Sequence, residues 1–424
     1  MSLRERPAEA PSSPPSHSLP SSRNLRFLLL DSWKEEVVQG TGTTVGISNR
    51  VRGLRALGHE VTVLGLPPGR GPFLLRRILF NVRLPHRLAK HVAAHPPHVV
   101  VGFDVDGFRL RKTSICRNRP NPADDGPSTP GPQSTGGASP FVVELKGVAA
   151  DEARYATGLD RAQLLLLAAL ERRNAQNAHL VVVPSRYSAD VVRRYYQVEP
   201  ERLTVVPEGI DLDAWEEPPS RHGPSDSPPT ILSVGHQYPR KNTVTLLRAH
   251  RRVLARLPDA RLRIVGGGPE LPRLRREARE LGVEARVTFL GPVPSHEQVR
   301  EEYRRAHCFC LPSLQEGFGI VFLEAMAAGL PVVGPDRGAP PEVLGEAGLT
   351  VPPEESSALA RALIQVLTSP ALREDMARRG LRRVRRYDYR TVARAYHRRL
   401  VEHLFGPGIE GGPEKKEETT CTSG

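Results

Sequence analysis

Short apolar runs alternate with amphipathic segments along the chain from about residue 24 onward. The runs form two series, at residues 24–31, 60–66, 98–104, 140–147, 178–185 and 202–209, and then at 230–236, 261–268, 286–293, 307–313, 330–336 and 348–353. Helical patterns lie between them, for example at 47–58 and 243–257. Apolar strands that alternate with helices are typical of parallel sheets covered on both faces. The pattern therefore predicts an α/β protein with two doubly wound domains, whose ligands bind at the carboxyl ends of the strands.

A segment rich in proline, serine and charge separates the two series. It covers residues 213–229 and predicts an interdomain linker. We therefore expect an N-terminal domain at residues 23–212 and a C-terminal domain at residues 230–387. Three polar segments have compositions that favour disorder, and they are the tail at 1–22, an insertion at 113–140 and the tail at 406–424.

The bulk composition limits the class of protein. Of the 424 residues, 39% are hydrophobic and 25% are charged, as in ordinary soluble proteins. No apolar run reaches the roughly 18 residues of a membrane span, and the N-terminus lacks the apolar core of a secretory signal. Only four cysteines occur, without zinc or CxxC spacing. We therefore predict a cytoplasmic protein without a disulfide framework.

The formal net charge of +13 would suit nucleic acid, anionic lipid or a phosphorylated substrate. Only 5% of the residues are aromatic, and the sequence has neither zinc-finger spacing nor an RRM-like signature. We therefore predict no nucleic-acid partner.

The stretch EGFGIVFLEAMAAGLPVVG, residues 316–334, places two carboxylates in unusual surroundings. Glu324 lies in a helical run that is apolar on nearly every face, where an ionised carboxylate is costly unless it is paired. It either meets an arginine or binds a ligand diol, whose two hydroxyls can each donate to one carboxylate oxygen. Glu316 lies in the preceding turn, where Gly317 and Gly319 let the backbone approach a ligand. The amides that follow open a helix N-terminus, so the motif suits a molecule with sugar, phosphate and ribose in a row.

Several motifs, in order, resemble those of the retaining glycosyltransferases of family 4. The two glutamates around GFG, followed by EAMAAGLPVV, look like the donor-binding motif of that family. Further similar segments are VVPEGIDLDAW (PNGID in the family), LSVGHQYPRKNTVTLLRAH, LRIVGGGPE, VTFLGPVP and RGAPPEVLGEAGLTVPP. The resemblance covers most of residues 24–404 and implies the GT-B fold, in which two Rossmann-like domains face each other across a cleft. The N-terminal domain is then the acceptor side, the C-terminal domain binds the nucleotide sugar, and residues 388–405 form a helix that crosses back.

The resemblance also implies roles for individual residues. The implied donor-binding residues are Gly42, Gly235, Arg240, Lys241, Glu316, Gly317, Phe318, Gly319, Ile320 and Glu324. Among them, Glu316 is expected to contact the transferred sugar and Glu324 to hold the ribose diol. Arg240 and Lys241 are expected to grip the diphosphate, although such a pair can also be a solvated loop. With Glu316 they are the catalytic candidates, because negative charge develops on the leaving diphosphate and fixed cations stabilise it.

The chain departs from the family after the strand predicted at 140–147. The family often has a histidine there, whereas this chain has Lys146. A protonated lysine can bind a sugar hydroxyl or a phosphate, but it lacks the acceptor nitrogen of a neutral imidazole. Lys146 and Asp151 are therefore candidates for acceptor-side or sugar contacts, and Glu152 remains an alternative to Asp151.

A basic stretch at residues 69–95 contains no acidic residue and has apolar residues such as Phe73 and Leu79. One interpretation is an amphipathic element that lies on the anionic inner face of a membrane. The other is an ordinary surface helix of a basic protein.

The predicted activity is transfer of a sugar from a nucleotide-diphosphate sugar to an acceptor hydroxyl, with retention at the anomeric carbon. The acceptor is a glycan, a lipid-linked molecule or a small molecule. The resemblance implies that neither a metal ion nor another cofactor is needed, because positive side chains stabilise the charge. Two alternatives remain open: a sugar-nucleotide epimerase or hydrolase of the same fold, and a binding protein that has lost catalysis.

Overall fold

The computed structural model describes residues 24–33, 42–67, 70–110, 139–215, 227–293 and 295–406. The segments predicted at 1–22, 113–140, 213–229 and 406–424 lie wholly or mostly outside these residues.

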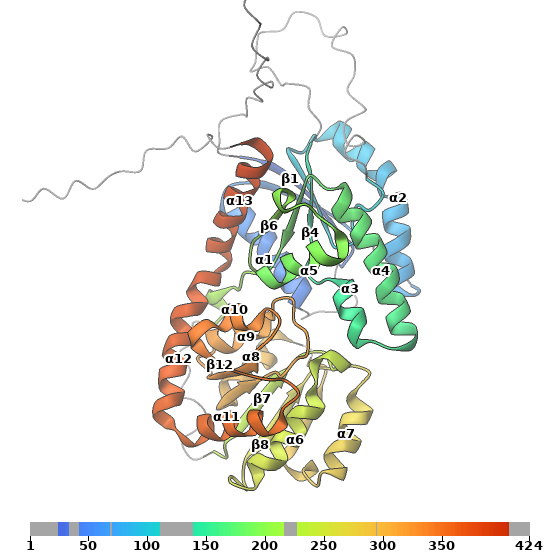
Figure 1. Cartoon of the computed structure of the whole chain (residues 1–424). Helices are drawn as coiled ribbons and strands as arrows, with labels where there is room; N and C mark the ends of the chain where they lie inside the picture. Colours follow the sequence, from blue (N-terminus) through green and yellow to red (C-terminus); the bar gives the residue numbers. More distant parts are fainter. Residues whose placement is uncertain are drawn as a thin grey trace, which may run out of the picture.

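Two six-stranded parallel sheets form two domains, one above the other in Figure 1. The N-terminal sheet has the strand order β2-β1-β3-β4-β5-β6, and the C-terminal sheet has the order β12-β11-β10-β7-β8-β9. The first sheet contains β1 (Arg26–Asp31), β2 (Glu60–Gly65), β3 (Val99–Phe103), β4 (Phe141–Glu144), β5 (Leu180–Val183) and β6 (Leu203–Val205). The second contains β7 (Thr230–Val234), β8 (Arg261–Val265), β9 (Val287–Gly291), β10 (Cys308–Cys310), β11 (Val332–Pro335) and β12 (Gly348–Val351). Each predicted apolar run contains one strand, so the prediction of two doubly wound domains is confirmed.

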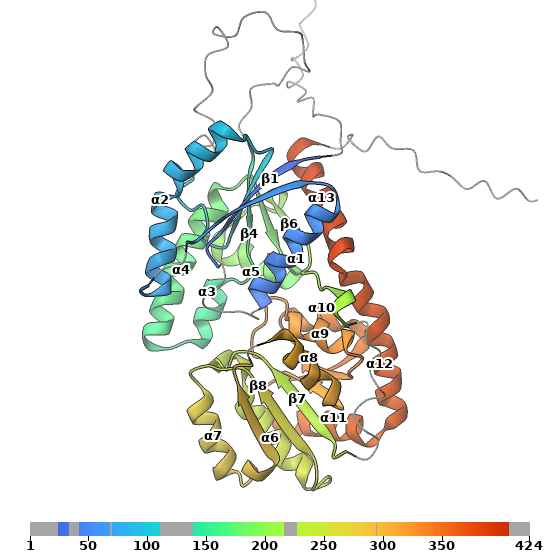
Figure 2. The same cartoon turned by 180° about the vertical axis from the view of Figure 1, so that it is seen from behind.

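Helices cover both faces of each sheet (Figures 1 and 2). Those next to the N-terminal sheet are α1 (Gly42–Ala56), α2 (Phe73–Ala94), α3 (Ala149–Glu152), α4 (Gly158–Asn177) and α5 (Arg186–Tyr196). Those next to the C-terminal sheet are α6 (Thr243–Leu254), α7 (Leu271–Glu280), α8 (His296–Arg305), α9 (Ile320–Ala327), α10 (Pro340–Leu344), α11 (Ser356–Thr368) and α12 (Pro370–Val384), and the chain ends its described part with α13 (Tyr389–Phe405).

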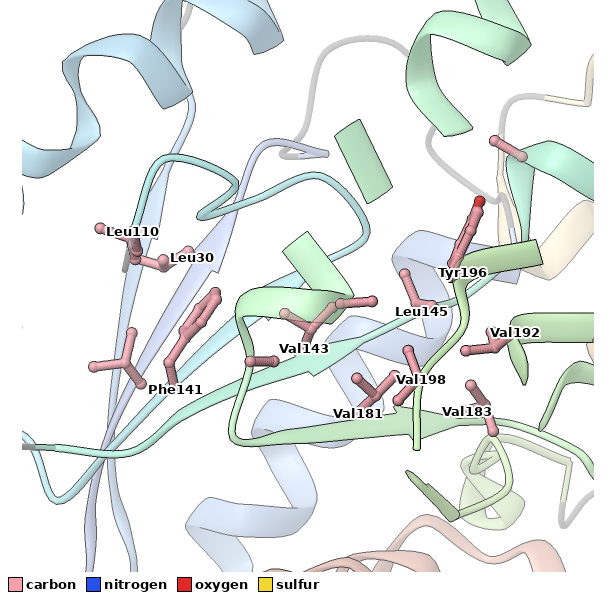
Figure 3. Packing of buried hydrophobic residues seen from close by; sticks show 14 of the residues in the cluster. Leu30, Leu110, Phe141, Val143, Leu145, Val181, Val183, Val192, Tyr196 and Val198 are labelled. Atoms are coloured by element: carbon pink, nitrogen blue, oxygen red, sulfur yellow. The ribbon is translucent and has the colours of Figure 1, made fainter. Parts of the chain in front are cut away.

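The N-terminal sheet is buried on both faces because alternate side chains of a strand point to opposite sides. Leu28 and Leu30 of β1 join the cluster formed with α2, α4 and α5, which Figure 3 shows around Phe141. Their neighbours Phe27 and Leu29 join a second cluster on the other face. The continuous apolar strands seen in the sequence follow from this double burial.

The last helix, α13, packs on the N-terminal domain although it follows the C-terminal sheet in sequence. Its buried residues Val392, Tyr396 and Leu400 belong to the same cluster as Phe27 of β1, and α13 lies beside α1 in both views (Figures 1 and 2). The chain therefore passes between the domains twice. The two crossings pair with each other, because the amide of Tyr389 donates to the carbonyl of Ile210 at 2.9 Å.

Candidate functional site

Glu316 lies in the turn between β10 and α9 and is almost completely buried, with 6% of its surface exposed. Its carboxylate accepts hydrogen bonds from Lys241 Nζ and, at 2.9 Å, from Ser313 Oγ. Arg240 Nη1 lies 3.9 Å from the other carboxylate oxygen. Burial by itself would raise the pKa of Glu316, but Lys241 and Arg240 lower it overall. Glu316 is therefore held as an ionised carboxylate inside the protein.

Arg240 and Lys241 form a short 3-10 turn, Pro239–Lys241, after the carboxyl end of β7. The turn is fixed to the Glu316 segment, because the amide of Leu314 donates to the carbonyl of Arg240 at 2.7 Å. A Cβ atom added at Gly235 would lie 3.8 Å from Lys241 Cε, so Gly235 is adjacent to the same side chain. The structure thus brings together four of the predicted donor-binding residues, which are Gly235, Arg240, Lys241 and Glu316. We call Arg240 and Lys241 the cation pair.

The N-terminal domain contacts the turn before α9 directly. The hydroxyls of Ser185 and Ser188, at the start of α5, donate to the carbonyl of Gly317 at 2.7 and 3.0 Å. Gly42 is the first residue of α1, and a Cβ atom there would lie only 2.9 Å from Cγ2 of Ile320. Glycine at position 42 therefore allows the ends of α1 and α9 to approach each other. Sequence analysis missed the two serines. Ser185 stands between a strand and a helix, where serine is a recognisable N-cap residue.

Phe318 and Gly319 complete the turn. Phe318 is buried, and its ring packs edge-on against Tyr387, with centroids 5.9 Å apart. Gly319 caps α9 with φ of 86°, a conformation that disfavours other residues. Both residues therefore set the path of the backbone.

Glu324 is half-buried on α9, where its carboxylate accepts a hydrogen bond of 2.9 Å from the hydroxyl of Tyr303. Burial raises the pKa of Glu324, while this hydrogen bond opposes the rise. The hydrogen-bond partner is thus a tyrosine, while an arginine of the kind considered from the sequence, Arg300, lowers the pKa of Glu324 electrostatically. Tyr303 was missed, although it is the only aromatic residue of the charged helix α8.

Lys146 is buried in a network of charges, with 4% of its side chain exposed. Its Nζ lies 3.0 Å from Glu144 and 2.9 Å from Glu208, and Arg50 lies 3.3 Å from Glu144. Burial would raise the pKa of Glu144, but Arg50 and Lys146 bring it down to about 2. Lys146 therefore neutralises two buried carboxylates, and the structure does not present it as an unpaired cation.

The partners of Lys146 were missed from the sequence. One signal was available, because Glu208 stands in PEGID where the family motif has asparagine, while Lys146 stands at the position of the histidine. The two departures introduce opposite charges, and the structure places these charges in contact.

Helix α1 has a glycine at the point where Glu208 approaches it. A Cβ atom at Gly46 would lie 2.4 Å from Oε2 of Glu208, closer than any real contact. We expect Gly46→Ala to lower the free energy of unfolding by about 1–3 kcal/mol through overpacking, despite a helix-propensity gain of about 1 kcal/mol. Urea denaturation measures this change. The control is Ser48→Ala on the exposed side of α1, and equal stability of both variants with the wild type would contradict the expectation.

Asp151 is buried in α3 and serves the local fold. It accepts hydrogen bonds from the hydroxyl of Tyr187 at 2.6 Å and from Nη1 of Arg154 at 2.9 Å. The next residue, Glu152, reaches the C-terminal domain, where its Oε1 lies 3.2 Å from Nη2 of Arg240. Of the two acidic residues left open by the sequence, Glu152 is the one at the cation pair.

Two family models match the chain. The model for glycosyl transferases group 1 matches residues 216–383, and the model for glycosyltransferase family 4 matches residues 139–214. A phosphatidyl-myo-inositol mannosyltransferase of Mycolicibacterium smegmatis is 37% identical over 225 residues, which are 51% of this chain and 57% of that protein. A D-inositol 3-phosphate glycosyltransferase of Corynebacterium glutamicum is 30% identical over 257 residues, 57% of this chain and 61% of that protein. The chain thus spans about half the length of the curated relatives it matches.

Solved structures match over nearly the whole chain. A sucrose-phosphate synthase from Thermosynechococcus elongatus superposes with a TM-score of 0.70 at 20% identity, covering 90% of this chain and 100% of the other. HepE of Anabaena, solved in complex with UDP and glucose, gives 0.64 at 19% identity, covering 89% and 99%. These likenesses establish a two-domain GT-B architecture. The two family models, which together match residues 139–383, and the relatives support the glycosyltransferase of family 4 that the motifs predicted.

Proposed function

We propose that this protein is a retaining glycosyltransferase that moves a sugar from a nucleotide-diphosphate sugar to an acceptor hydroxyl. The observation that carries the proposal is the buried, ionised Glu316, held by the cation pair at the start of α9, where the N-terminal domain contacts the same turn. The names of the relatives favour a transferase over an epimerase, a hydrolase or a binding protein without catalysis.

Each part of this arrangement has a role in the proposed reaction. Arg240 and Lys241 stabilise the negative charge that develops on the leaving diphosphate, and the first amides of α9 add donors for the phosphate. Glu316 accepts hydrogen bonds from hydroxyls of the transferred sugar. Glu324 binds the ribose diol. The hydroxyls of the diol donate to its carboxylate in place of the hydroxyl of Tyr303 or together with it. The leaving phosphate takes the acceptor proton, so no covalent nucleophile of the protein is required.

The relatives suggest which substrates to test first. Their names specify mannosyl transfer to phosphatidyl-myo-inositol, dependence on GDP-mannose and transfer to D-inositol 3-phosphate. We therefore propose a donor of the GDP-mannose type and an acceptor that carries an inositol-like polyol, with UDP-glucose, the ligand named for HepE, as the comparison donor. We also propose that transfer needs no added metal ion, because the cation pair supplies fixed positive charge beside the diphosphate.

A panel of radiolabelled donors tests the function. GDP-mannose and UDP-glucose are incubated with the protein, with and without inositol 3-phosphate or phosphatidylinositol, in EDTA and in magnesium. Labelled product that forms only with an acceptor supports the proposal, and equal rates in EDTA support a metal-independent reaction. Release of free sugar without an acceptor would indicate a hydrolase. Donor binding without any product would indicate a binding protein.

We further propose that α2 binds anionic membranes peripherally. Leu75, Leu79 and Val82 are 52%, 42% and 41% exposed and lie at helical spacing. The same helix carries the exposed basic residues Arg83, Arg87 and Lys90, the last two of which line a hollow of about 680 Å³ together with Glu60. Apolar side chains bordered by basic ones suit the headgroup region of an anionic leaflet. Within the described residues, no helix is long and apolar enough to cross a membrane.

Co-sedimentation with liposomes tests this surface. We expect wild-type protein to bind vesicles that contain anionic lipid, with binding that weakens as salt rises. The triple variant Leu75→Ser/Leu79→Ser/Val82→Ser should lose most of this binding. Leu381→Ser removes a comparably exposed leucine from α12 and should bind like wild type. Equal binding by all three proteins, or no binding by the wild type, would refute membrane contact through α2.

A further inference from the structure

The cation pair is shared between carboxylates of two domains. Lys241 pairs with Glu316 of its own domain. Arg240 lies 3.9 Å from Glu316 but only 3.2 Å from Glu152, which belongs to the N-terminal domain. Of these two carboxylates, the one nearer to Arg240 therefore belongs to the opposite domain.

Glu152 lies in a segment that hydrogen bonds hold to the rest of the N-terminal domain. It is the last residue of α3, which lies at the end of that domain next to the C-terminal half (Figures 1 and 2). The preceding Asp151 is fixed by Tyr187 and Arg154, and the amide of Ala149 donates to Glu171 at 3.0 Å. Gly147 lies close to the carboxylate, since a Cβ atom there would be 3.1 Å from Oε1 of Glu152. These contacts fix the position from which Glu152 reaches Arg240.

A diphosphate held by Arg240 would lie close to the carboxylate of Glu152. The carboxylate and the phosphate oxygens carry the same charge and require the same guanidinium of Arg240. Both side chains are partly buried, with 19% of Arg240 and 25% of Glu152 exposed, so solvent screens the repulsion only in part. Burial would lower the pKa of Arg240, but Glu152 and Glu316 raise it, which keeps the guanidinium charged.

On the basis of the proposed function, we propose that Glu152 lowers the affinity of the protein for its donor. Its carboxylate forms an ion pair with Arg240, and the donor diphosphate must displace this carboxylate in order to bind. The contact joins the two domains when no donor is bound. Binding of the diphosphate then breaks an interdomain ion pair, so donor affinity is lower than the cation pair alone would give. Glu152 acts through Arg240 and takes no part in bond making or breaking.

Isothermal titration calorimetry with GDP and UDP tests this proposal on the full chain. In Glu152→Gln the competing charge is absent while the size of the side chain is kept. We expect its Kd for the better-bound nucleotide to fall by about 1.5-fold to fivefold at low salt, the range that a partly exposed ion pair provides. The difference should shrink at high salt, because solvent ions screen the pair.

The matched control is Glu201→Gln, an exposed glutamate at the amino end of the edge strand β6, which should bind like wild type. A second arm repeats Glu152→Gln in an Arg240→Gln background, where the gain in affinity should disappear. A gain that persists without Arg240 would overturn the proposal.

The remaining outcomes separate this proposal from the proposed function. Equal affinity in wild type and Glu152→Gln would overturn the role of Glu152 alone. Weaker binding by Glu152→Gln would also overturn it, because Glu152 would then be a direct ligand of the nucleotide. If no protein of the set bound either nucleotide, both the competition and the proposed donor would be refuted.

Discussion

Lys241→Met is expected to lower the rate of sugar transfer by about a hundredfold to a thousandfold, since it removes a fixed cation from the developing charge of the leaving diphosphate. It should also lower the free energy of unfolding by about 3 kcal/mol, the usual cost of leaving one member of a buried ion pair unpaired. The unpaired member is Glu316, which would retain Ser313 and the more distant Arg240. Transfer of labelled sugar and urea denaturation measure the two effects.

A second variant separates the two effects. In Lys241→Met/Glu316→Gln no buried carboxylate is left without its partner, so most of the lost stability should return. Activity should stay low, because both charged groups of the proposed reaction are absent. The control is Arg276→Met, which removes an exposed cation from α7 and should change neither quantity. Recovery of transfer in the double variant would show that Lys241 acts on the fold alone.

Lys146→Met is expected to cause the largest loss of stability, about 3–5 kcal/mol of unfolding free energy. Glu144 would keep Arg50 at 3.3 Å, whereas Glu208 would lose its contact with the lysine. We therefore expect Lys146→Met/Glu208→Gln to recover much of the loss. Lys90→Met, on the exposed face of α2, serves as the control and should leave unfolding unchanged.

The loss in Lys146→Met should depend on pH in a defined direction. In the wild type the pKa of Glu144 is about 2, below its ordinary value of 4.5, so its ion pairs stabilise the fold above 4.5 and this stabilisation is lost as the pH falls toward 2. Without Lys146 the pKa of Glu144 rises toward the ordinary value. The stability difference between variant and wild type should therefore be larger at neutral pH than below pH 4.5. A difference that grows with acidification would contradict the assigned ion pairs.

The sequence was sufficient to predict the fold because its signals are local. Each strand is a short apolar run, and each run lies between helical patterns, so the alternation could be read without knowledge of any contact. The helix boundaries were less accurate. The helix expected at 47–58 begins at Gly42 in the structure, because a polar first turn carries no apolar periodicity.

The candidate site was only partly predictable. The residues around Glu316 form recognisable motifs, and the structure places Arg240 and Lys241 next to them. Glu152 was named only as an alternative to Asp151, and the partners of Lys146 had a single signal, the glutamate in PEGID. They depend on which charges the two domains bring within a few ångströms of each other.

The sequence by itself determined two α/β domains, the motif around Glu316 and the cation pair, because each is encoded by neighbouring residues. Only the tertiary structure decided that Lys146 pairs with Glu144 and Glu208 rather than standing unpaired. It also decided that Asp151 supports α3 while Glu152 contacts Arg240. The physical reason is that the state of a charged side chain depends on burial and on partners distant in sequence, which local patterns do not specify.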